Sequence, residues 1–315
     1  QMHSLLFPGQ GSQSVGMGLE LYNNFDLVKR IFNHADEKLN FKISKIILEG
    51  PSETLQLTQN TQPAILIVSY SIFQVMKKEF NFDFSIYKYF AGHSLGEYSA
   101  LVCANSLNFE DALYLLSERG KAMQKAVPVG KGQMIAVLGS KIEDIYNFIK
   151  EKNSKDKGIC EIANDNAEGQ VIISGDSESV KFFQLNLKEK KIKTIPLKVS
   201  APFHCSLMQP AADSMQQKIR KTEFKKPSNK IIHNVTAQPS NESENIQDLL
   251  VKQIYSSVRW RESIINMAHD GVKNFIEIGP GKALSGMVKR TLKNANSFSI
   301  NSITDIKNLE NEFKK

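Results

Sequence analysis

The chain has 315 residues, of which 41% are hydrophobic and 23% are charged, as in a folded protein long enough to bury one or two cores. The formal net charge is +7, but most basic residues are lysines and no zinc-finger or RNA-binding signature is present, which argues against a nucleic-acid module. Three cysteines without a C-x-x-C pair argue against a disulfide framework and favour a reducing, cytoplasmic compartment. The apolar run at 64–73 is too short to cross a membrane, and the N-terminal apolar stretch is too short for a secretory signal.

The first part of the chain alternates predicted strands and helices. Buried strands are predicted at 4–7 and 86–92, where short apolar runs end at turn residues. Helical patterns occupy 19–39, 63–78, 95–104 and 110–126. The helix at 63–78 is expected to begin at Pro63, because proline is favoured in the first turn.

The middle of the chain has a different rhythm. Strands are predicted at 133–139, 158–163, 169–175 and 193–199, with helices at 141–152 and 177–190. The resulting order, β-α-β-β-α-β, is that of a ferredoxin-like unit. We therefore predict a small inserted domain at 128–197.

The last part of the chain returns to alternating elements. Helices are predicted at 208–222, 246–255, 259–271 and 283–293, and strands at 230–237 and 274–279. Such alternation predicts an α/β core with a mostly parallel sheet that helices cover on both faces, formed by 1–127 and 198–315. Only the terminal NLENEFKK (308–315) has the composition of a disordered segment.

Residues 92–96 read Gly-His-Ser-Leu-Gly, a G-x-S-x-G pattern between a predicted strand and a predicted helix. This context is that of a nucleophile elbow, in which the serine hydroxyl is exposed beyond the strand end. The amide of Leu95 would lie at the helix N-terminus and point toward a developing oxyanion. The flanking elements favour Ser94 as a nucleophile over a turn with a purely structural role.

A serine nucleophile needs an adjacent base, and the chain has six histidines. His204 follows a predicted strand, and strand ends in α/β sheets face the ligand crevice, so it is the candidate base. His93 is next to Ser94, but adjacent side chains on a sharp turn point apart, and His233 has the apolar context of a core residue. No acid is apparent to orient the base, since Asp165 and Asp176 fall in the predicted small domain. A backbone carbonyl is the alternative.

Arg119 lies inside the predicted helix 110–126 of a chain that mostly uses lysine. The pattern alone favours an exposed surface position, and the functional alternative is a guanidinium fork that binds a carboxylate. The loop FPGQGSQ (7–13) lacks the third glycine of a dinucleotide-binding fingerprint, so no nucleotide cofactor and no metal are expected. Its backbone amides are still free to face a ligand.

Eight motifs, in the same order along the chain, resemble the malonyl-CoA:acyl carrier protein transacylases of fatty acid synthesis. They are FPGQGSQ (7–13), TQPAILI (61–67), GHSLGEYSAL (92–101), ERGKAMQ (118–124), NDNAEGQVIISG (164–175), SAPFHCSLM (200–208), LVKQIYSSVRW (250–260) and EIGPGKALSGMVKR (277–290). The match runs from Ser4 to about Ile300. It also implies the fold predicted above, a hydrolase-like core with an inserted ferredoxin-like domain.

The resemblance implies a catalytic role for five positions. Ser94 is the implied acyl-accepting nucleophile, and His204 is its general base. The main-chain carbonyl of Gln253 is implied to orient the histidine. The main-chain N–H groups of Gln10 and Leu95 are the implied oxyanion hole.

The same resemblance implies substrate-binding residues. Arg119 would bind the free carboxylate of the malonyl group, with Gln62 and Phe203 beside it; Phe203 resembles the bulky residue of malonyl-selective relatives. Asn164 and Asn166 match a loop that lines the pocket in the family.

The implied reaction transfers malonyl from malonyl-CoA to the phosphopantetheine thiol of acyl carrier protein through a malonyl-serine, without a cofactor. Lysine-dense stretches at 181–198 and 218–230 are either solvated helix faces or a docking surface for an acidic partner. A monomer is expected, since no heptad or self-complementary helix is visible. A serine esterase or thioesterase with the same elbow, and a non-catalytic module that binds the carrier, are the alternatives.

Overall fold

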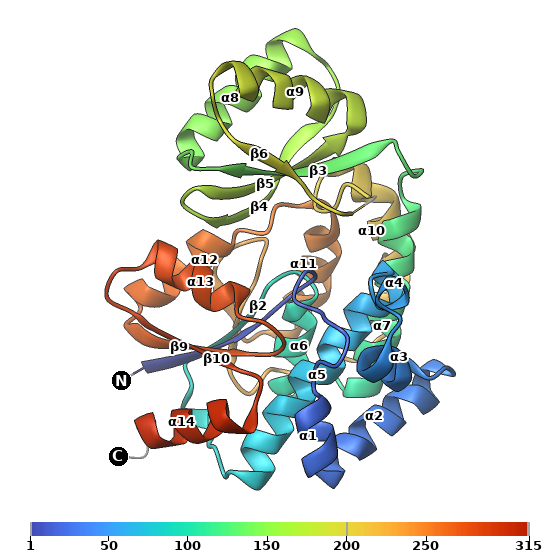
Figure 1. Cartoon of the computed structure of the whole chain (residues 1–315), viewed down its shortest axis with the longest axis vertical. Coiled ribbons are helices and arrows are strands. Elements are labelled where there is room, and N and C mark those ends of the chain that lie inside the picture. The colour runs from blue at the N-terminus through green and yellow to red at the C-terminus, as the bar shows by residue number, and fades with distance from the viewer. Residues whose placement is uncertain (1, 200, 314–315) are drawn as a thin grey trace.

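The computed structural model describes residues 2–199 and 201–313 (Figure 1). Gln1, Ser200 of the SAPFHCSLM motif and the last two residues of the predicted disordered tail lie outside this described part. Two sheets organise the chain: a six-stranded sheet in the larger part, and a four-stranded sheet above it in the view of Figure 1.

The six-stranded sheet is almost entirely parallel. Its strands, in spatial order, are β10 (Asn296–Ile300), β9 (Val272–Ile278), β1 (Met2–Phe7), β2 (Tyr89–Gly92), β7 (Lys230–Ile232) and β8 (Pro239–Ser240). Every neighbouring pair is parallel except β7 and β8, which are antiparallel. The predicted α/β class with a mostly parallel sheet is confirmed.

Helices cover both faces of this sheet, as the alternation of side chains along a strand requires. Leu5 and Phe7 of β1 pack into one apolar cluster, and Leu6 between them packs into another. The first cluster includes buried residues of α2 (Asp26–Leu39), α5 (Thr58–Glu79), α6 (Gly96–Cys103) and α7 (Phe109–Lys125). The second includes those of α12 (Trp260–His269) and α13 (Ala283–Thr291).

The four-stranded sheet is antiparallel throughout and has the spatial order β4-β5-β3-β6. Its elements are β3 (Gly132–Leu138), α8 (Ile142–Lys155), β4 (Cys160–Ala167), β5 (Gln170–Asp176), α9 (Ser177–Glu189) and β6 (Thr194–Pro196). A separate apolar cluster joins the two helices to the sheet. The element order is the predicted ferredoxin-like one; that 128–197 is a domain in its own right stays a prediction.

The remaining helices and 3-10 turns complete the fold. They are α1 (Leu19–Asn24), α3 (Ile43–Glu49), α4 (Ser52–Leu55), α10 (Gln209–Arg220), α11 (Ser243–Tyr255), α14 (Ile303–Phe313) and the 3-10 turns Phe84–Ile86 and Ser206–Met208. No helix in the described part of the chain is long and apolar enough to span a membrane.

Several predicted elements are wrong in extent. The single helix predicted at 19–39 is two helices, because Phe25 between them is extended at φ −134°. The strand predicted at 230–237 ends at Ile232. The tail predicted to be disordered is helical through Phe313, and its Leu309 is buried against the core. The polar composition of this tail suggests disorder, but its helix is amphipathic. Packing of the apolar face against the core stabilises the helix.

Helix α5 does not begin at Pro63 as predicted but at Thr58, so the proline lies inside it. Proline cannot donate a main-chain hydrogen bond, which disfavours it beyond the first turn. Nearly every side chain from Asn60 to Ser69 is buried, however, and this burial outweighs the lost bond. The shift matters, because it places Gln62 within a rigid helix rather than ahead of one.

Helices α5 and α7 meet at Gly120, where a side chain would not fit. A Cβ there would lie 2.6 Å from the Cα of Gln59 and 2.7 Å from the carbonyl oxygen of Thr58, both parts of the main chain. We expect Gly120→Ala to destabilise the protein by about 1–3 kcal/mol through overpacking. Gly286→Ala in α13 is the control, since its Cβ would meet nothing within 4 Å, and alanine there should be neutral or stabilising. Equal thermal midpoints for the two variants would contradict this packing argument.

Candidate active site

Ser94 lies between the end of β2 and the start of α6, on a turn that the sequence can form only with its two glycines. A Cβ on Gly92 would overlap the main chain of Gly96, and a Cβ on Gly96 would overlap the carbonyl of Phe7. Ser94 itself has φ 55°, in the left-handed region that non-glycine residues rarely adopt. The close approach of strand and helix therefore projects Ser94 beyond the end of the sheet, as the elbow pattern predicts.

The structure brings Ser94, His204 and Gln253 together from distant parts of the chain. Ser94 Oγ lies 2.7 Å from His204 Nε2, and His204 Nδ1 lies 2.9 Å from the main-chain oxygen of Gln253. A carbonyl oxygen only accepts, so Nδ1 carries the proton and Nε2 is the acceptor. The serine hydroxyl thus donates to a ring nitrogen that has a free lone pair, which is the arrangement of a nucleophile and its base.

The environment of His204 keeps its imidazole neutral. The ring is buried, and burial lowers its pKa to about 3, with the positive charge of Arg119 adding to the effect. The hydrogen bond to the Gln253 carbonyl opposes this shift but does not cancel it. At neutral pH the residue is therefore in the form that accepts a proton.

Arg119 is fully buried, so the surface position favoured by the helical pattern alone is wrong. Its Nη1 donates to Gln62 Oε1 at 2.8 Å, and its Nη2 donates to Gln253 Oε1 at 2.8 Å and to Ser94 Oγ at 3.2 Å. Nε has no hydrogen-bond partner among the described residues. Burial lowers the pKa of the guanidinium, but arginine stays charged in proteins.

No carboxylate forms an ion pair with Arg119 among the residues that the structure describes. Two neutral amides hold the guanidinium instead. A buried cation without an anionic partner is costly, so the site favours a ligand that brings a negative charge. The cation lies within hydrogen-bond distance of the Ser94 oxygen, so such an anion would be held next to the Ser94 hydroxyl.

Three further residues implied by the resemblance are Leu95, Gln10 and Phe203. Leu95 precedes the first turn of α6, and Gln10 follows β1 in a half-buried loop. Neither main-chain N–H donates a hydrogen bond within the described part of the chain, so both keep a donor unused by the protein. Phe203 is buried in the large apolar cluster.

The other candidate residues have partners elsewhere. His93 Nε2 lies 2.7 Å from Asn166 Oδ1, and among the described residues Ser94 Oγ contacts His204 and not His93. Asn164 and Asn166 belong to β4 rather than to a loop. Asp165 forms an ion pair with Arg261 at 3.0 Å, which confirms that it does not orient His204.

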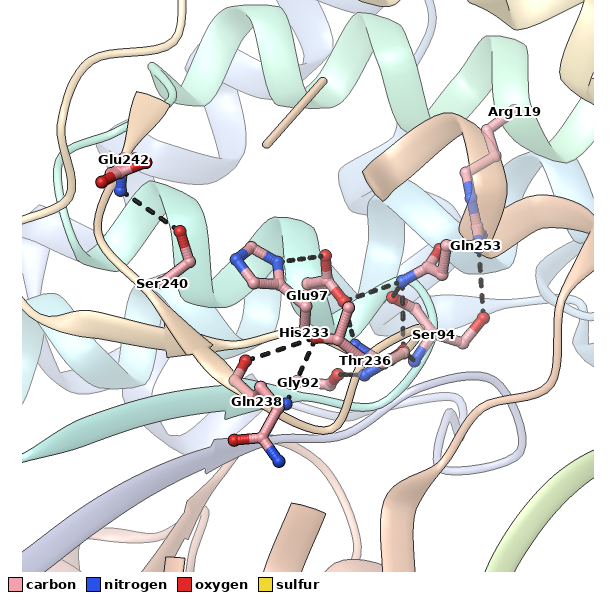
Figure 2. A network of polar contacts seen from close by, with 11 residues as sticks. Gly92, Ser94, Glu97, Arg119, His233, Thr236, Gln238, Ser240, Glu242 and Gln253 are labelled. Atoms are coloured by element: carbon pink, nitrogen blue, oxygen red, sulfur yellow. Dashed lines mark hydrogen bonds and ion pairs between the residues drawn. The ribbon is translucent and has the colours of Figure 1, made fainter. Parts of the chain in front are cut away.

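Two functional contacts escape the sequence patterns: the side chains of Gln253 and Asn234. Gln253 was implied only through its carbonyl, yet its side chain also contacts Arg119 and Ser94. Figure 2 shows Ser94, Arg119 and Gln253 joined in this network, together with Glu97. Asn234 was read as part of a strand, whereas β7 ends at Ile232 and places it beyond the strand end. No pattern in the sequence marks this end of β7, so nothing in the sequence alone singles out Asn234.

Comparison with known proteins identifies the family of the chain. The acyl transferase domain matches residues 5–313. The malonyl CoA-acyl carrier protein transacylase of Bacillus subtilis (strain 168) is 42% identical over 299 residues, which are 94% of this chain and 92% of the relative. The crystal structure of an acyl-carrier-protein-S-malonyltransferase from Bartonella henselae is 38% identical, has a TM-score of 0.96 and is covered over 100% of both chains.

One solved structure adds a partner protein. It holds a type II PKS acyl-carrier protein in complex with its malonyl-transacylase, and this chain matches it with a TM-score of 0.94 and 37% identity over 99% of this chain and 100% of that one. The family match over nearly the whole length and the shared fold agree with the Ser94 elbow. The chain belongs to the acyl transferase family.

Proposed function

We propose that this protein transfers the malonyl group of malonyl-CoA to the phosphopantetheine thiol of acyl carrier protein, through an ester on Ser94. The observation that carries the proposal is the position of Ser94 Oγ, 2.7 Å from a neutral His204 and 3.2 Å from the buried Arg119. The oxygen therefore lies within hydrogen-bond distance both of a base and of a cation that can bind a carboxylate. The relatives named above are malonyl transacylases, which supports this reading over a serine esterase or thioesterase.

In the first step, His204 Nε2 accepts the Ser94 proton while Oγ attacks the thioester carbonyl. The Oγ–C bond forms and the oxygen of the tetrahedral intermediate becomes negative. We expect the main-chain N–H groups of Leu95 and Gln10 to donate to this oxyanion, and each such donor contributes about 3–4 kcal/mol in related acyl transfer. The C–S bond then breaks, and coenzyme A leaves as a thiol with the proton from His204.

The second step is the reverse with a new thiol. The carrier's phosphopantetheine thiol gives its proton to His204 and attacks the ester carbonyl. The Oγ–C bond breaks, and Ser94 regains its proton from the histidine. No metal or cofactor takes part in this scheme, because the coenzyme A thioester is itself the activated substrate.

Specificity for malonyl is assigned to Arg119, which Gln62 contacts, and we expect Phe203 to contribute to the same acyl pocket. The guanidinium can pair with the free carboxylate of malonyl through two parallel hydrogen bonds, which acetyl cannot form. Gln62 holds Nη1, so the fork is oriented before the substrate arrives.

We also propose the cellular context of the reaction: a carrier of fatty acid synthesis, action in the cytoplasm and a monomeric protein. A carrier of polyketide synthesis, as in the complex named above, is the alternative. A net charge of +7 favours association with an acidic carrier protein.

Initial rates measured at several concentrations of malonyl-CoA and of phosphopantetheinylated carrier test the two-step scheme. A ping-pong mechanism predicts parallel lines in double-reciprocal plots, because the first product leaves before the second substrate reacts. Intersecting lines would mean direct transfer within a ternary complex, and would overturn the proposed ester. If the protein bound the carrier but catalysed no transfer, it would be the non-catalytic carrier-binding module.

The pH dependence of kcat/KM tests the state of His204. Since its pKa is lowered to about 3, the free enzyme keeps a neutral base, and kcat/KM should stay flat from pH 7.5 down to 5. A histidine with an ordinary pKa would be only about 3% neutral at pH 5. Arg119→Ala should move the acid limb to higher pH, because the nearby positive charge is removed. A half-maximal kcat/KM near pH 6.5 in the wild type would contradict the assignment.

A further inference from the structure

The left-handed turn at Ser94 needs contacts that hold it. A non-glycine residue with φ 55° is strained, and such a conformation persists only where its surroundings fix it. The side chain of Asn234 provides two of these contacts. Its Oδ1 accepts the main-chain N–H of Ser94 at 2.8 Å, and its Nδ2 donates to the carbonyl of Gly92 at 2.7 Å. A single amide therefore joins the last residue of β2 to the nucleophile.

Glu97, in the first turn of α6, anchors Asn234 in turn. The main-chain N–H of Asn234 donates to Glu97 Oε1 at 2.8 Å, and both residues are 1% exposed. His233 Nδ1 lies 3.3 Å from the other carboxylate oxygen. Because these groups are withdrawn from water, loss of any one contact leaves a buried polar group unpaired.

Gln253 holds the other end of the Ser94 backbone. Its Nε2 lies 3.0 Å from the carbonyl oxygen of Ser94, 3.1 Å from Asn234 Oδ1 and 3.3 Å from Glu97 Oε1. Figure 2 shows Gln253 between Glu97 and Arg119, with Ser94 beneath it. The nucleophile, the guanidinium and the residue that orients the base thus belong to one buried network.

We propose that Asn234 is a positioning residue for acyl transfer, with Glu97 as its anchor. It occupies the Ser94 N–H and fixes the turn so that the hydroxyl is aimed at His204, while the neighbouring Leu95 N–H stays open. The inference rests on Ser94 being the nucleophile, as proposed above. The Asn234 side chain bonds only to Ser94, Gly92 and Gln253 within the described part of the chain, so it sets the rate of acylation and not the affinity for malonyl-CoA.

The test compares Asn234→Ala with Asn229→Ala. Asn229 is also a buried asparagine whose Nδ2 bonds to two main-chain carbonyls, those of Phe84 and Tyr87, but it has no contact with the site. The readouts are the rate at which phenylmethanesulfonyl fluoride labels Ser94 and the rate of acylation by saturating malonyl-CoA. In the labelling step the Oγ–S bond forms, fluoride leaves and the serine proton passes to His204.

For Asn234→Ala, we expect both rates to fall about 10- to 100-fold, because a small displacement of the nucleophile has effects of this size. The malonyl-CoA concentration that gives half the maximal acylation rate should stay within about twofold of wild type. Asn229→Ala should keep both rates at wild-type values even where its thermal midpoint falls as much. Equal rates in the two variants, or a loss confined to malonyl-CoA affinity, would overturn the proposal.

Asn234→Asp serves if the alanine variant does not fold. A protonated aspartic acid has the same donor and acceptor as asparagine, whereas its carboxylate cannot donate to Gly92. Burial and a nearby carboxylate such as Glu97 favour the protonated form of such a group, whereas the positive charge of Arg119 favours the ionised form, and His233 is the other ionisable member of the network. The labelling rate of this variant, relative to wild type, should rise as pH falls from 8.5 to 6. A ratio of variant to wild-type labelling rates that does not change with pH would count against the positioning role of Asn234.

The two readouts separate this inference from the proposed function. A wild-type protein that the sulfonyl fluoride labels at Ser94 but malonyl-CoA does not acylate would refute the proposed substrate. The labelling rates of the Asn234 variants would then still decide the positioning role. A wild-type protein without labelling at Ser94 would refute both.

Discussion

Ser94→Ala is expected to lower malonyl transfer by about 10⁴-fold or more, the range seen when the nucleophile of a serine–histidine pair is removed. The ester cannot form without Oγ, and water or a thiol would have to attack malonyl-CoA without an enzyme-bound intermediate. Intact-protein mass spectrometry should find no malonyl adduct on the variant. Transfer assays with the carrier protein measure the loss of rate.

Ser99→Ala is the matched control for this substitution. Ser99 is fully buried in the same helix, α6, and its hydroxyl has no hydrogen-bond partner among the described residues. Removing that hydroxyl should leave both the transfer rate and the adduct unchanged. A Ser94→Ala variant that keeps even a tenth of the wild-type rate would show that the reaction does not pass through this residue.

Arg119→Ala is expected to lower malonyl transfer roughly 10²- to 10³-fold, since truncating one partner of a buried charge pair costs about 2–5 kcal/mol. Acetyl transfer, measured with acetyl-CoA, should fall only about tenfold or less, through the lost hydrogen bond to Ser94 Oγ. The measured quantity is the ratio of kcat/KM for the two acyl groups. It should be determined above pH 7, where His204 is neutral in both proteins.

Arg259→Ala is a control that removes a guanidinium from a structural ion pair. Arg259 pairs with Glu262 at 2.7 Å and is partly exposed, so its loss should leave the malonyl-to-acetyl ratio unchanged. Equal losses for malonyl and acetyl in Arg119→Ala would show that Arg119 supports Ser94 without binding the malonyl carboxylate.

The main architecture follows from local patterns in the sequence. Apolar runs that end at glycine or proline identify β1, β2 and β9, and the G-x-S-x-G pattern places Ser94 between a strand and a helix. The β-α-β-β-α-β order of the smaller sheet is equally local. The errors occur where tertiary burial outweighs a local signal, as at Pro63 inside α5 and at the helical tail.

The site is less local, because its residues, from Gln10 to Gln253, come from segments that are far apart in the sequence. The helical pattern around Arg119 favours solvent exposure over the alternative of a carboxylate-binding fork, and the family resemblance is what favours the fork. A periodic pattern identifies which face of a helix is apolar, but not whether a long polar side chain reaches inward to a partner. Sequence patterns do not reveal the contacts of the Gln253 and Asn234 side chains either. Both side chains bond to the main chain of Ser94, which lies more than a hundred residues away in the chain.

The most direct test of the account is a chase of the acylated enzyme, followed by intact-protein mass spectrometry. The wild-type protein is exposed briefly to malonyl-CoA, freed of excess substrate and mixed either with phosphopantetheinylated carrier protein or with buffer alone. We predict a malonyl adduct on Ser94 that passes to the carrier much faster than it is lost to water. Release of free malonate at the same rate with and without carrier would identify a hydrolase and contradict the account.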